Sequence, residues 1–318
     1  MNNEVIPIFF SVDDNYVPYL AVALNSIIAN ASAVNKYKII VLHQGISEEN
    51  KNKIKSLSKD GFEIEFVAMK DSLECITDRM SNRLRADYFT LTIYFRLFIP
   101  TMFPEYDKGI YLDSDIVVLE DIAKLYNIEL GDNLIGASVD YSIQNIPEFA
   151  KYTSEGVGVK VSEYINSGIL LMDLKKLREA NIDSRFLELL NTYHFDSIAP
   201  DQDYLNALCY GKIKYLSGKW DTMPADGVPE TENPYLIHYN LFAKPWCYDD
   251  IQYEKYFWHY AKKSGYLEEI QEHKKNYSNE QKKSDKECVM RMLKRALEIS
   301  EQQENFKTVF ESGKERRL

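Results

Sequence analysis

The first half of the chain alternates short apolar, β-branched runs with amphipathic stretches, a pattern typical of βαβ units around a mainly parallel sheet. The apolar runs predict strands at Val5–Val12, Tyr37–Leu42, Ile64–Ala68, Gly109–Leu112 and Leu134–Val139. The stretches between them predict helices at Val17–Asn30, Ser47–Ser58, Asp71–Met80 and Thr92–Phe98. Ser47 is a natural N-cap for its helix, and Pro100 is expected to end the last one. Ligands of such open sheets bind beyond the carboxyl ends of the strands, so the segments that follow the strands are the ones to search.

The pattern changes in the second half, where Tyr141–Glu163 has no clear period and is expected to be a lid or a flexible insertion. Further strands are predicted at Ile169–Met172 and Tyr235–His238. Further helices are predicted at Leu174–Arg178, Phe186–Tyr193, Asp201–Cys209 and Tyr253–Tyr260. Pro200 is placed to open the third of these helices. Gln271–Lys286 is polar and charged throughout, which predicts a linker.

An apolar stripe follows this predicted linker on a helix rich in lysine and arginine, formed by Val289, Leu293, Ala296 and Leu297. From Gln271 onward the chain carries 12 Lys and Arg against 9 Asp and Glu, so this part has a net charge of +3 and the rest −14, within a total of −11. Three interpretations of the stripe are open: docking on the same domain, homodimer formation, or peripheral contact with a membrane surface. Protein packing is favoured, because the acidic residues dilute the basic face.

Composition narrows the class of protein. With 318 residues, of which 45% are hydrophobic, the chain can bury the core of one large α/β domain. Its net charge of −11 argues against a nucleic acid as substrate. Met1–Val12 lacks a basic start and is interrupted by Pro7, so no signal peptide is expected, and no apolar run reaches membrane-spanning length. The cysteines lack disulfide-framework spacing, which indicates a reducing cytoplasm: Cys75, Cys209, Cys247 and Cys288.

The sharpest local signal for chemistry is an apolar run that delivers Asp113 and Asp115 just as a predicted strand ends. Alternate residues of an extended chain point to one side, so both carboxylates can face one cation, and oxygen ligands suit Mg²⁺ or Mn²⁺. The Asp-x-Asp spacing alone is weak, because Asp201-Gln-Asp203 repeats it. A solvated strand end is the simpler explanation of that spacing by itself.

Two other segments are open to the same double interpretation. Asn166-Ser-Gly168 places a polar side chain and a glycine just before a buried strand, where a ligand can approach the backbone closely, although an ordinary turn also fits. His238 leaves an apolar strand, and Lys244 stands just before Pro245. Taken alone, each of these two residues fits a structural or surface role.

Five motifs together resemble glycosyltransferase family 8, and bacterial lipopolysaccharide galactosyl- and glucosyltransferases in particular. In chain order they are residues 11–16 (SVDDNY), 111–115 (YLDSD), 164–173 (YINSGILLMD), 201–206 (DQDYLN) and the group His238, Lys244, Pro245 and Trp246. The resemblance extends over residues 6–263 and implies a GT-A-type α/β fold, with a mixed, mainly parallel sheet flanked by helices. Together with the change in composition that follows, it predicts a catalytic domain over residues 1–270 and a helical C-terminal extension over residues 271–318.

The same resemblance implies retaining, metal-dependent transfer of glucose or galactose from a UDP-sugar to a saccharide, glycolipid or glycoprotein acceptor. Asp13, Asn15 and Tyr16 match the turn that holds the nucleotide, and Asp140 is the candidate on the acceptor side. The implied metal ligands are Asp113, Asp115 and His238, with Mn²⁺ favoured over Mg²⁺ because one ligand is nitrogen. The implied donor-binding set is Asp13, Asn15, Tyr16, Arg96, Asp113, Ser114, Asp115, Asn166, Ser167, Asp201, Gln202, His238 and Lys244. The implied catalytic residues are Gln202, Asp201, Arg96 and Lys244.

One residue departs from the family pattern, because Leu241 stands where such enzymes commonly carry a glycine whose backbone lies against the diphosphate. Gln202 is the candidate on the face opposite the leaving group, but an amide is a poor nucleophile. We therefore expect same-face substitution, with the departing phosphate oxygen taking the acceptor's proton.

Three rival functions compete with sugar transfer to a separate acceptor. A nucleotidyltransferase is disfavoured, because no glycine-rich phosphate loop follows the first predicted strand. A protein that binds UDP and metal without turnover stays open, as does glycogenin-like self-glucosylation. The expected location is the cytoplasm, including the inner face of its membrane if the C-terminal helix binds there.

Overall fold

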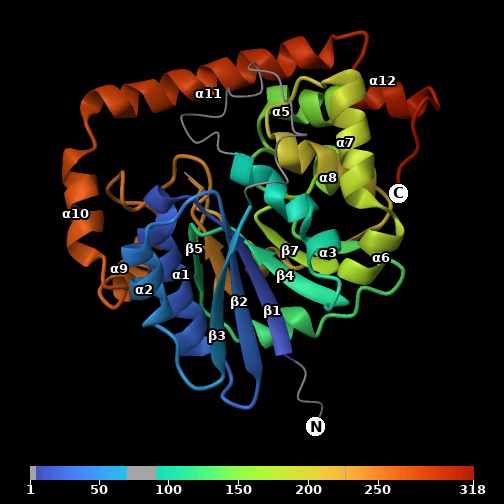
Figure 1. Cartoon of the computed structure of the whole chain (residues 1–318). Coiled ribbons are helices and arrows are strands. Elements are labelled where there is room, and N and C mark those ends of the chain that lie inside the picture. Colours follow the sequence, from blue (N-terminus) through green and yellow to red (C-terminus); the bar gives the residue numbers. More distant parts are fainter. Residues whose placement is uncertain (1–4, 70–90, 226) are drawn as a thin grey trace.

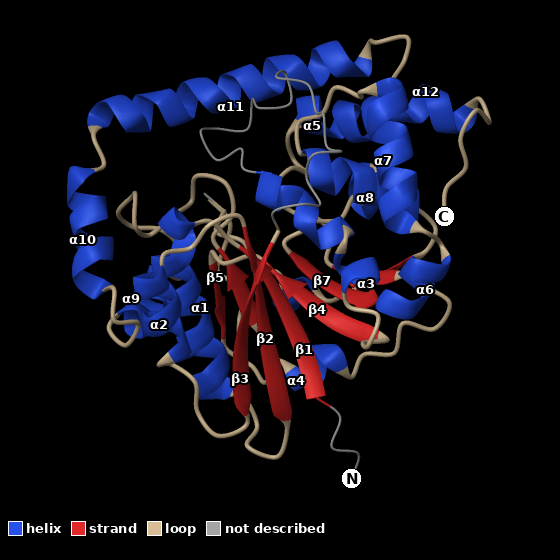
Figure 2. Cartoon of the chain, viewed as in Figure 1, coloured by secondary structure: helices blue, strands red, loops and turns tan. Residues whose placement is uncertain are grey.

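The computed structural model describes residues 5–69, 91–225 and 227–318. The predicted helix Asp71–Met80 and Cys75 lie outside the described residues. Within the described ranges, one sheet lies at the centre of the molecule and helices flank it (Figures 1 and 2). The predicted α/β architecture is confirmed.

The central sheet has seven described strands in the order β3-β2-β1-β4-β7-β6-β8. Their bounds are β1 Val5–Ser11, β2 Lys36–His43, β3 Phe62–Ala68, β4 Lys108–Leu112, β6 Ile135–Ala137, β7 Ile169–Asp173 and β8 Ile213–Tyr215. Strands β1 to β4 are parallel, whereas β7 runs antiparallel to both β4 and β6. The sheet is therefore mixed and mainly parallel, as predicted. Two short strands outside it, β5 Ile116–Val118 and β9 Leu236–His238, pair antiparallel.

Helices cover both faces of the sheet (Figure 1). Their bounds are α1 Val17–Asn30, α2 Glu48–Lys55, α3 Ile99–Met102, α4 Ala123–Tyr126, α6 Leu174–Glu179, α7 Ile182–Tyr193, α8 Pro200–Cys209 and α9 Glu254–Ala261. Successive residues of β1 point to opposite faces, so Phe9 belongs to one hydrophobic core while Ile8 and Phe10 belong to the other. The continuous apolar run of β1 is thus explained by burial on both faces.

The predicted N-cap at Ser47 is confirmed, whereas the helix end predicted at Pro100 is not. Ser47 caps α2 as expected, because its hydroxyl accepts a hydrogen bond from the backbone N–H of Asn50 at 3.3 Å. Pro100 does not end a helix. The predicted helix Thr92–Phe98 is a 3₁₀ helix, Leu91–Leu97, and Pro100 lies in the first turn of α3, where its missing N–H costs no hydrogen bond.

The segment Tyr141–Glu163 is not the irregular loop that its lack of a period predicts. It contains the helix α5 Pro147–Lys151, the π-helix Tyr152–Val157 and a 3₁₀ turn at Val161–Glu163. Tyr152 is buried, and its hydroxyl donates to Asp203 at 2.5 Å, so this segment is tied to α8.

The prediction of a linker at Gln271–Lys286 is wrong, because the chain there is helical. The C-terminal helices are α10 Leu267–Asn276, α11 Asn279–Ser300 and α12 Phe306–Glu311, and α11 crosses the top of the molecule in Figure 1. Ser278 and Gln281 form a capping box at the start of α11. This segment is polar because only one narrow face of each helix packs against the rest of the protein, while the other faces are exposed.

The buried face of α11 is displaced from the predicted stripe. Cys288, Met292, Ala296 and Ile299 are buried, whereas Val289 and Leu297 each keep 37% of their surface exposed. The buried residues of α11 and α12 join the hydrophobic core that also contains α7 and α8. Packing on the same body is therefore the interpretation of the stripe that the contacts favour.

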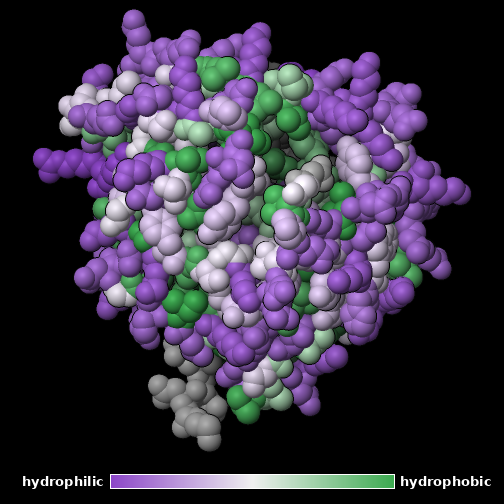
Figure 3. Space-filling view, turned by 180° about the vertical axis from the view of Figure 1, so that it is seen from behind, coloured by the Kyte–Doolittle hydropathy of each residue, from purple (hydrophilic) through white to green (hydrophobic). Residues whose placement is uncertain are grey.

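The surface seen from behind is mostly hydrophilic with scattered apolar patches, and apolar side chains gather around a hollow in its upper half (Figure 3). None of the helices in the described ranges is both long enough and apolar enough to cross a bilayer.

Candidate metal and donor-binding site

The candidate metal site forms where β4 ends and β5 begins. Asp113, Ser114 and Asp115 occupy the gap between these strands, and Ser114 is buried. Because β5 pairs with β9, Ile116 lies opposite His238. The pairing of two three-residue strands thus brings a histidine from the second half of the chain beside the two acids.

The three predicted metal ligands form one cluster. Asp113, Asp115 and His238 each offer one ligand atom, and these atoms lie within 4.8 Å of one another. His238 Nε2 is 3.3 Å from Asp115 Oδ1 and 3.9 Å from Asp113 Oδ2. Asp115 Oδ1 is buried, and apart from this contact with His238 it has no other hydrogen-bond partner among the described residues. Two carboxylates and one imidazole this close together fit a divalent cation such as Mn²⁺ or Mg²⁺.

Asp221, which the sequence did not single out, orients the histidine. Its Oδ1 lies 3.0 Å from His238 Nδ1, and this contact leaves Nε2 facing the acids. Burial disfavours the charged imidazole, but the carboxylates of Asp115 and Asp221 outweigh it and raise the pKa of His238 to about 10. Burial also raises the pKa of Asp221 to about 6, against the attraction of His238.

Gly168 allows the strand β7 to start close to this cluster. The backbone N–H of Asp113 donates to Gly168 O at 2.7 Å, and a Cβ atom at position 168 would lie 2.4 Å from His238 Cε1 and 2.8 Å from Asp113 Oδ2. Such contacts are too short for any side chain. Glycine is therefore required here by close approach, as the position before a buried strand suggested.

Arg96 connects the acids to the neighbouring helix α8. It is buried, and its guanidinium pairs with Asp113 at 2.9 Å and with Asp201 at 3.2 Å. The same group donates to Ser167 O at 2.6 Å and stacks on the Tyr111 ring, with its carbon 4.2 Å from the ring centre. A buried arginine thus balances part of the negative charge that the acids gather here.

The residues predicted to surround the donor sugar form one hydrogen-bonded network. Ser167 Oγ donates to Asp201 Oδ2 at 2.8 Å, and Ser167 N donates to Gln202 Oε1 at 3.1 Å. Asp140 Oδ2 accepts from Gln202 Nε2 at 3.0 Å and from Asn166 Nδ2 at 3.1 Å. The structure therefore brings together every predicted residue of this group, including the acceptor-side candidate.

Lys244 reaches the cluster from the loop after β9. It is buried, and its ammonium forms an ion pair with Asp115. Burial opposes ionisation of Asp115, but Lys244 and His238 outweigh it and hold the pKa of that carboxyl well below its usual range. Leu241, in the same loop, has a φ of +48°, so it keeps the left-handed backbone that a glycine would adopt readily.

The predicted nucleotide-binding turn lies at the end of β1, next to β4 in the sheet. Asp13 caps the turn and accepts from the N–H groups of Asn15 at 3.0 Å and Tyr16 at 3.2 Å. The ring of Tyr16 packs edge-on against Tyr19 at 5.3 Å, and Tyr19 stacks on Trp246 at 4.1 Å. The turn is thus connected to the Lys244 loop, while its contact with uracil stays a prediction.

A sheet of this topology, carrying an Asp-Ser-Asp segment and a histidine at one end, defines a GT-A-type protein of the class that uses nucleotide sugars. The chain belongs to glycosyltransferase family 8, whose model ("Glycosyl transferase family 8") matches residues 7–250.

Similarity to individual proteins agrees with this assignment. A Haemophilus influenzae protein that is provisionally named a glycosyltransferase is 32% identical over 70% of this chain, which spans 65% of that protein. The Escherichia coli lipopolysaccharide 1,2-glucosyltransferase is 27% identical over 80% of this chain and 77% of its own length. The galactosyltransferase LgtC, solved with donor and acceptor sugar analogues, superposes with a TM-score of 0.68 at 27% identity, over 81% of this chain and 96% of LgtC.

Proposed function

We propose that this family 8 glycosyltransferase moves glucose or galactose from a UDP-sugar to a saccharide, glycolipid or glycoprotein acceptor, with retention of the anomeric configuration. The observation that carries the proposal is the cluster of Asp113, Asp115 and His238, with Lys244 and Arg96 against it. Its position beyond the carboxyl end of β4 is where open α/β sheets bind ligands.

Asp113, Asp115 and His238 would hold the cation, and Mn²⁺ is preferred to Mg²⁺ because the imidazole is a nitrogen ligand. A bound cation would supply Lewis-acid stabilisation of the diphosphate as it departs. Lys244 lies against Asp115 and provides a second positive charge at the same place. Fixed charges of this kind commonly make the largest contribution to such catalysis.

Gln202 is held at both ends of its amide, which disfavours a covalent role. Its oxygen accepts from Ser167 N, and its nitrogen donates to Asp140. We therefore assign it to shaping the donor site. The acceptor hydroxyl forms its bond to the anomeric carbon on the face where the bond to UDP breaks, and its proton passes to the departing phosphate oxygen. Retention follows from this geometry without a glycosyl-enzyme.

The cytoplasm, including the inner face of its membrane, is the proposed location. Among the described residues, Cys209 and Cys247 are buried thiols, which suits a reducing compartment.

The test is to incubate the protein with Mn²⁺ and either UDP-glucose or UDP-galactose, and to follow both UDP release and the mass of the intact chain. We expect release of UDP from one of the two donors, slow with water and faster with an acceptor, while the protein mass stays constant. A mass increase in steps of one hexose would instead establish self-glycosylation. Binding of UDP without any release would establish a protein that lacks turnover.

A further inference from the structure

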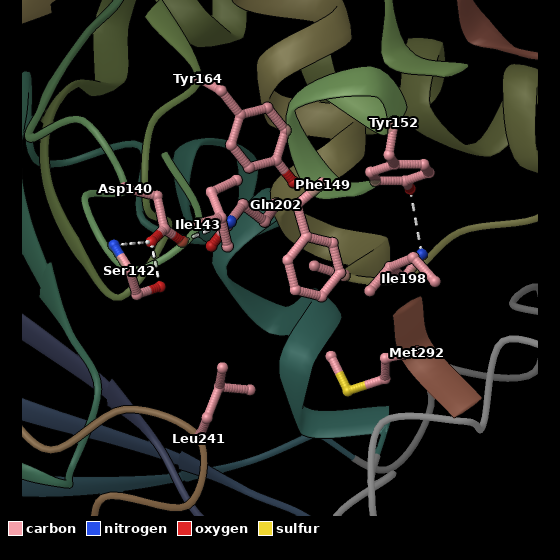
Figure 4. Close-up of a pocket in the computed structure, with 11 residues that line it drawn as sticks. Asp140, Ser142, Ile143, Phe149, Tyr152, Tyr164, Ile198, Gln202, Leu241 and Met292 are labelled. Atoms are coloured by element: carbon pink, nitrogen blue, oxygen red, sulfur yellow. Dashed lines mark hydrogen bonds between the residues drawn. The ribbon is translucent and has the colours of Figure 1, made fainter. Parts of the chain in front are cut away.

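A small pocket with mainly apolar walls, partly open to solvent, lies beside the donor-site network. Asp140 and Gln202 lie at one end of it, and apolar side chains make up much of the remaining wall, among them Phe149, Leu241 and Met292. Figure 4 shows the side chains of Leu241 and Met292 both extending toward Phe149, with Asp140 to one side. Met292 belongs to α11, which lies beyond the residues 7–250 matched by the family model.

The polar side chains of this pocket are already engaged with other protein groups. The two oxygens of Asp140 accept from Ser142 and from Gln202, respectively. The hydroxyls of Tyr152 and Tyr164 both donate to Asp203, each at 2.5 Å. A sugar ring laid against the apolar wall would gain few hydrogen bonds there, whereas an apolar group placed on it would remove apolar surface from water. An apolar group fits the pocket better.

Leu241 lines the pocket, and its backbone is strained. A φ of +48° is rarely adopted by residues with a branched side chain, and the turn in which it occurs joins His238 to Lys244. A strained backbone that is kept at this position indicates that the leucine side chain has a role there. The leucine keeps the turn that positions Lys244 and adds an apolar surface that a glycine would lack.

We propose that this pocket binds an apolar group, aromatic or short alkyl, attached to the acceptor sugar, and that Leu241 sets the preference for it. The inference rests on the proposed function, because Asp140 and Gln202 join the pocket to the donor-site network. It identifies the acceptor as a glycoconjugate whose sugar carries an apolar substituent, rather than an unsubstituted saccharide.

The test uses matched methyl and phenyl β-glycosides of glucose, galactose and N-acetylglucosamine. Calorimetry measures their binding to the full chain with Mn²⁺ and UDP, and UDP release from the donor is measured separately. We expect the phenyl glycoside of at least one pair to bind about tenfold more tightly than its methyl partner. Equal affinity within every pair, including undetectable binding of all of them, would overturn the inference. Absence of donor turnover would count against the proposed function alone.

Variants at Leu241 separate its side chain from its backbone. Leu241→Ala should reduce the phenyl-to-methyl ratio about tenfold, and Leu241→Met should preserve most of it. Comparing the phenyl-to-methyl affinity ratio between variants removes any loss of affinity that both glycosides share. Leu241→Gly should melt at a temperature at least as high as Leu241→Ala, since only glycine relieves the positive φ. The control Leu297→Ala, at an exposed leucine of α11, should leave the ratio unchanged. A ratio unaffected by Leu241→Ala would exclude a role for this residue.

Discussion

At the scale of single residues, the atoms around His238 leave no space for a side chain at Gly168. Gly168→Ala would place a methyl group 2.4 Å from His238 Cε1, so the ring or Asp113 has to move. We expect the affinity for Mn²⁺ to fall at least tenfold, as it does when residues that support metal ligands are changed. A titration followed by the electron paramagnetic resonance of Mn²⁺ measures this affinity. Gly45→Ala is the matched control, because a Cβ atom there meets nothing within 4 Å. Wild-type affinity in Gly168→Ala would show that the cation binds elsewhere.

The charge on His238 makes cation binding depend on pH. Its pKa of about 10 lies above the ordinary value of 6.5, so the ring is protonated at neutral pH and the proton stabilises the metal-free fold. That stability is fully present below about pH 6.5 and is lost as the pH rises through about 10. A cation has to displace this proton, so its affinity should rise about tenfold per pH unit between pH 6.5 and 8.5. Isothermal titration at three pH values checks this, and a flat profile would contradict the ligand role of His238.

Site residues differ in how far the sequence reveals them. Asp113 and Asp115 can be recognised as candidate ligands because they follow an apolar strand. His238 can be assigned to the same site only through the family resemblance. Asp221 carries no local signal, because it meets His238 through tertiary packing. The left-handed backbone of Leu241 is equally invisible in the sequence, since leucine has no preference for it.

At the level of elements, periodicity predicts long segments well and short ones poorly. The bounds of α1 agree with the prediction, whereas the three-residue strand β5 was missed although it positions the histidine. The π-helix Tyr152–Val157 was missed because it has no apolar repeat, and the bond from the Tyr152 hydroxyl to Asp203 that helps to hold it is a tertiary contact. The C-terminal charge pattern describes the exposed face of α11 and says little about its buried one.

The packing of α11 and α12 leads to a prediction about truncation. Composition suggests a detachable tail after residue 270, but Met292, Ile299 and Phe310 are buried in the core shared with α7 and α8. A chain ending at Lys275 would expose that core surface, so we expect it to melt at least 10 °C lower or to be insoluble, since burying each large apolar side chain contributes about 1.5–3 kcal/mol. Scanning calorimetry makes the comparison. An unchanged melting temperature would instead support an independent extension beginning at residue 271.

The whole molecule combines two halves of the chain at one end of a sheet. The first half supplies the acids and Arg96, and the second supplies His238, Lys244 and the α8 residues. The fold class could be predicted because apolar runs and helical periods are local. The assembled site could be predicted only through the family resemblance, since strand pairing between the halves has no local signal.

The most direct test of this account is the metal dependence of UDP release from the UDP-sugar that the protein turns over. Excess chelator should abolish release, and added Mn²⁺ should restore it better than Ca²⁺. Asp115→Asn should lower the restored rate at least about a hundredfold. Asp121→Asn should have little effect on it, because Asp121 bonds to Tyr37 and lies outside the cluster. Full turnover in excess chelator, or equal losses in the two variants, would contradict the assignment of the site.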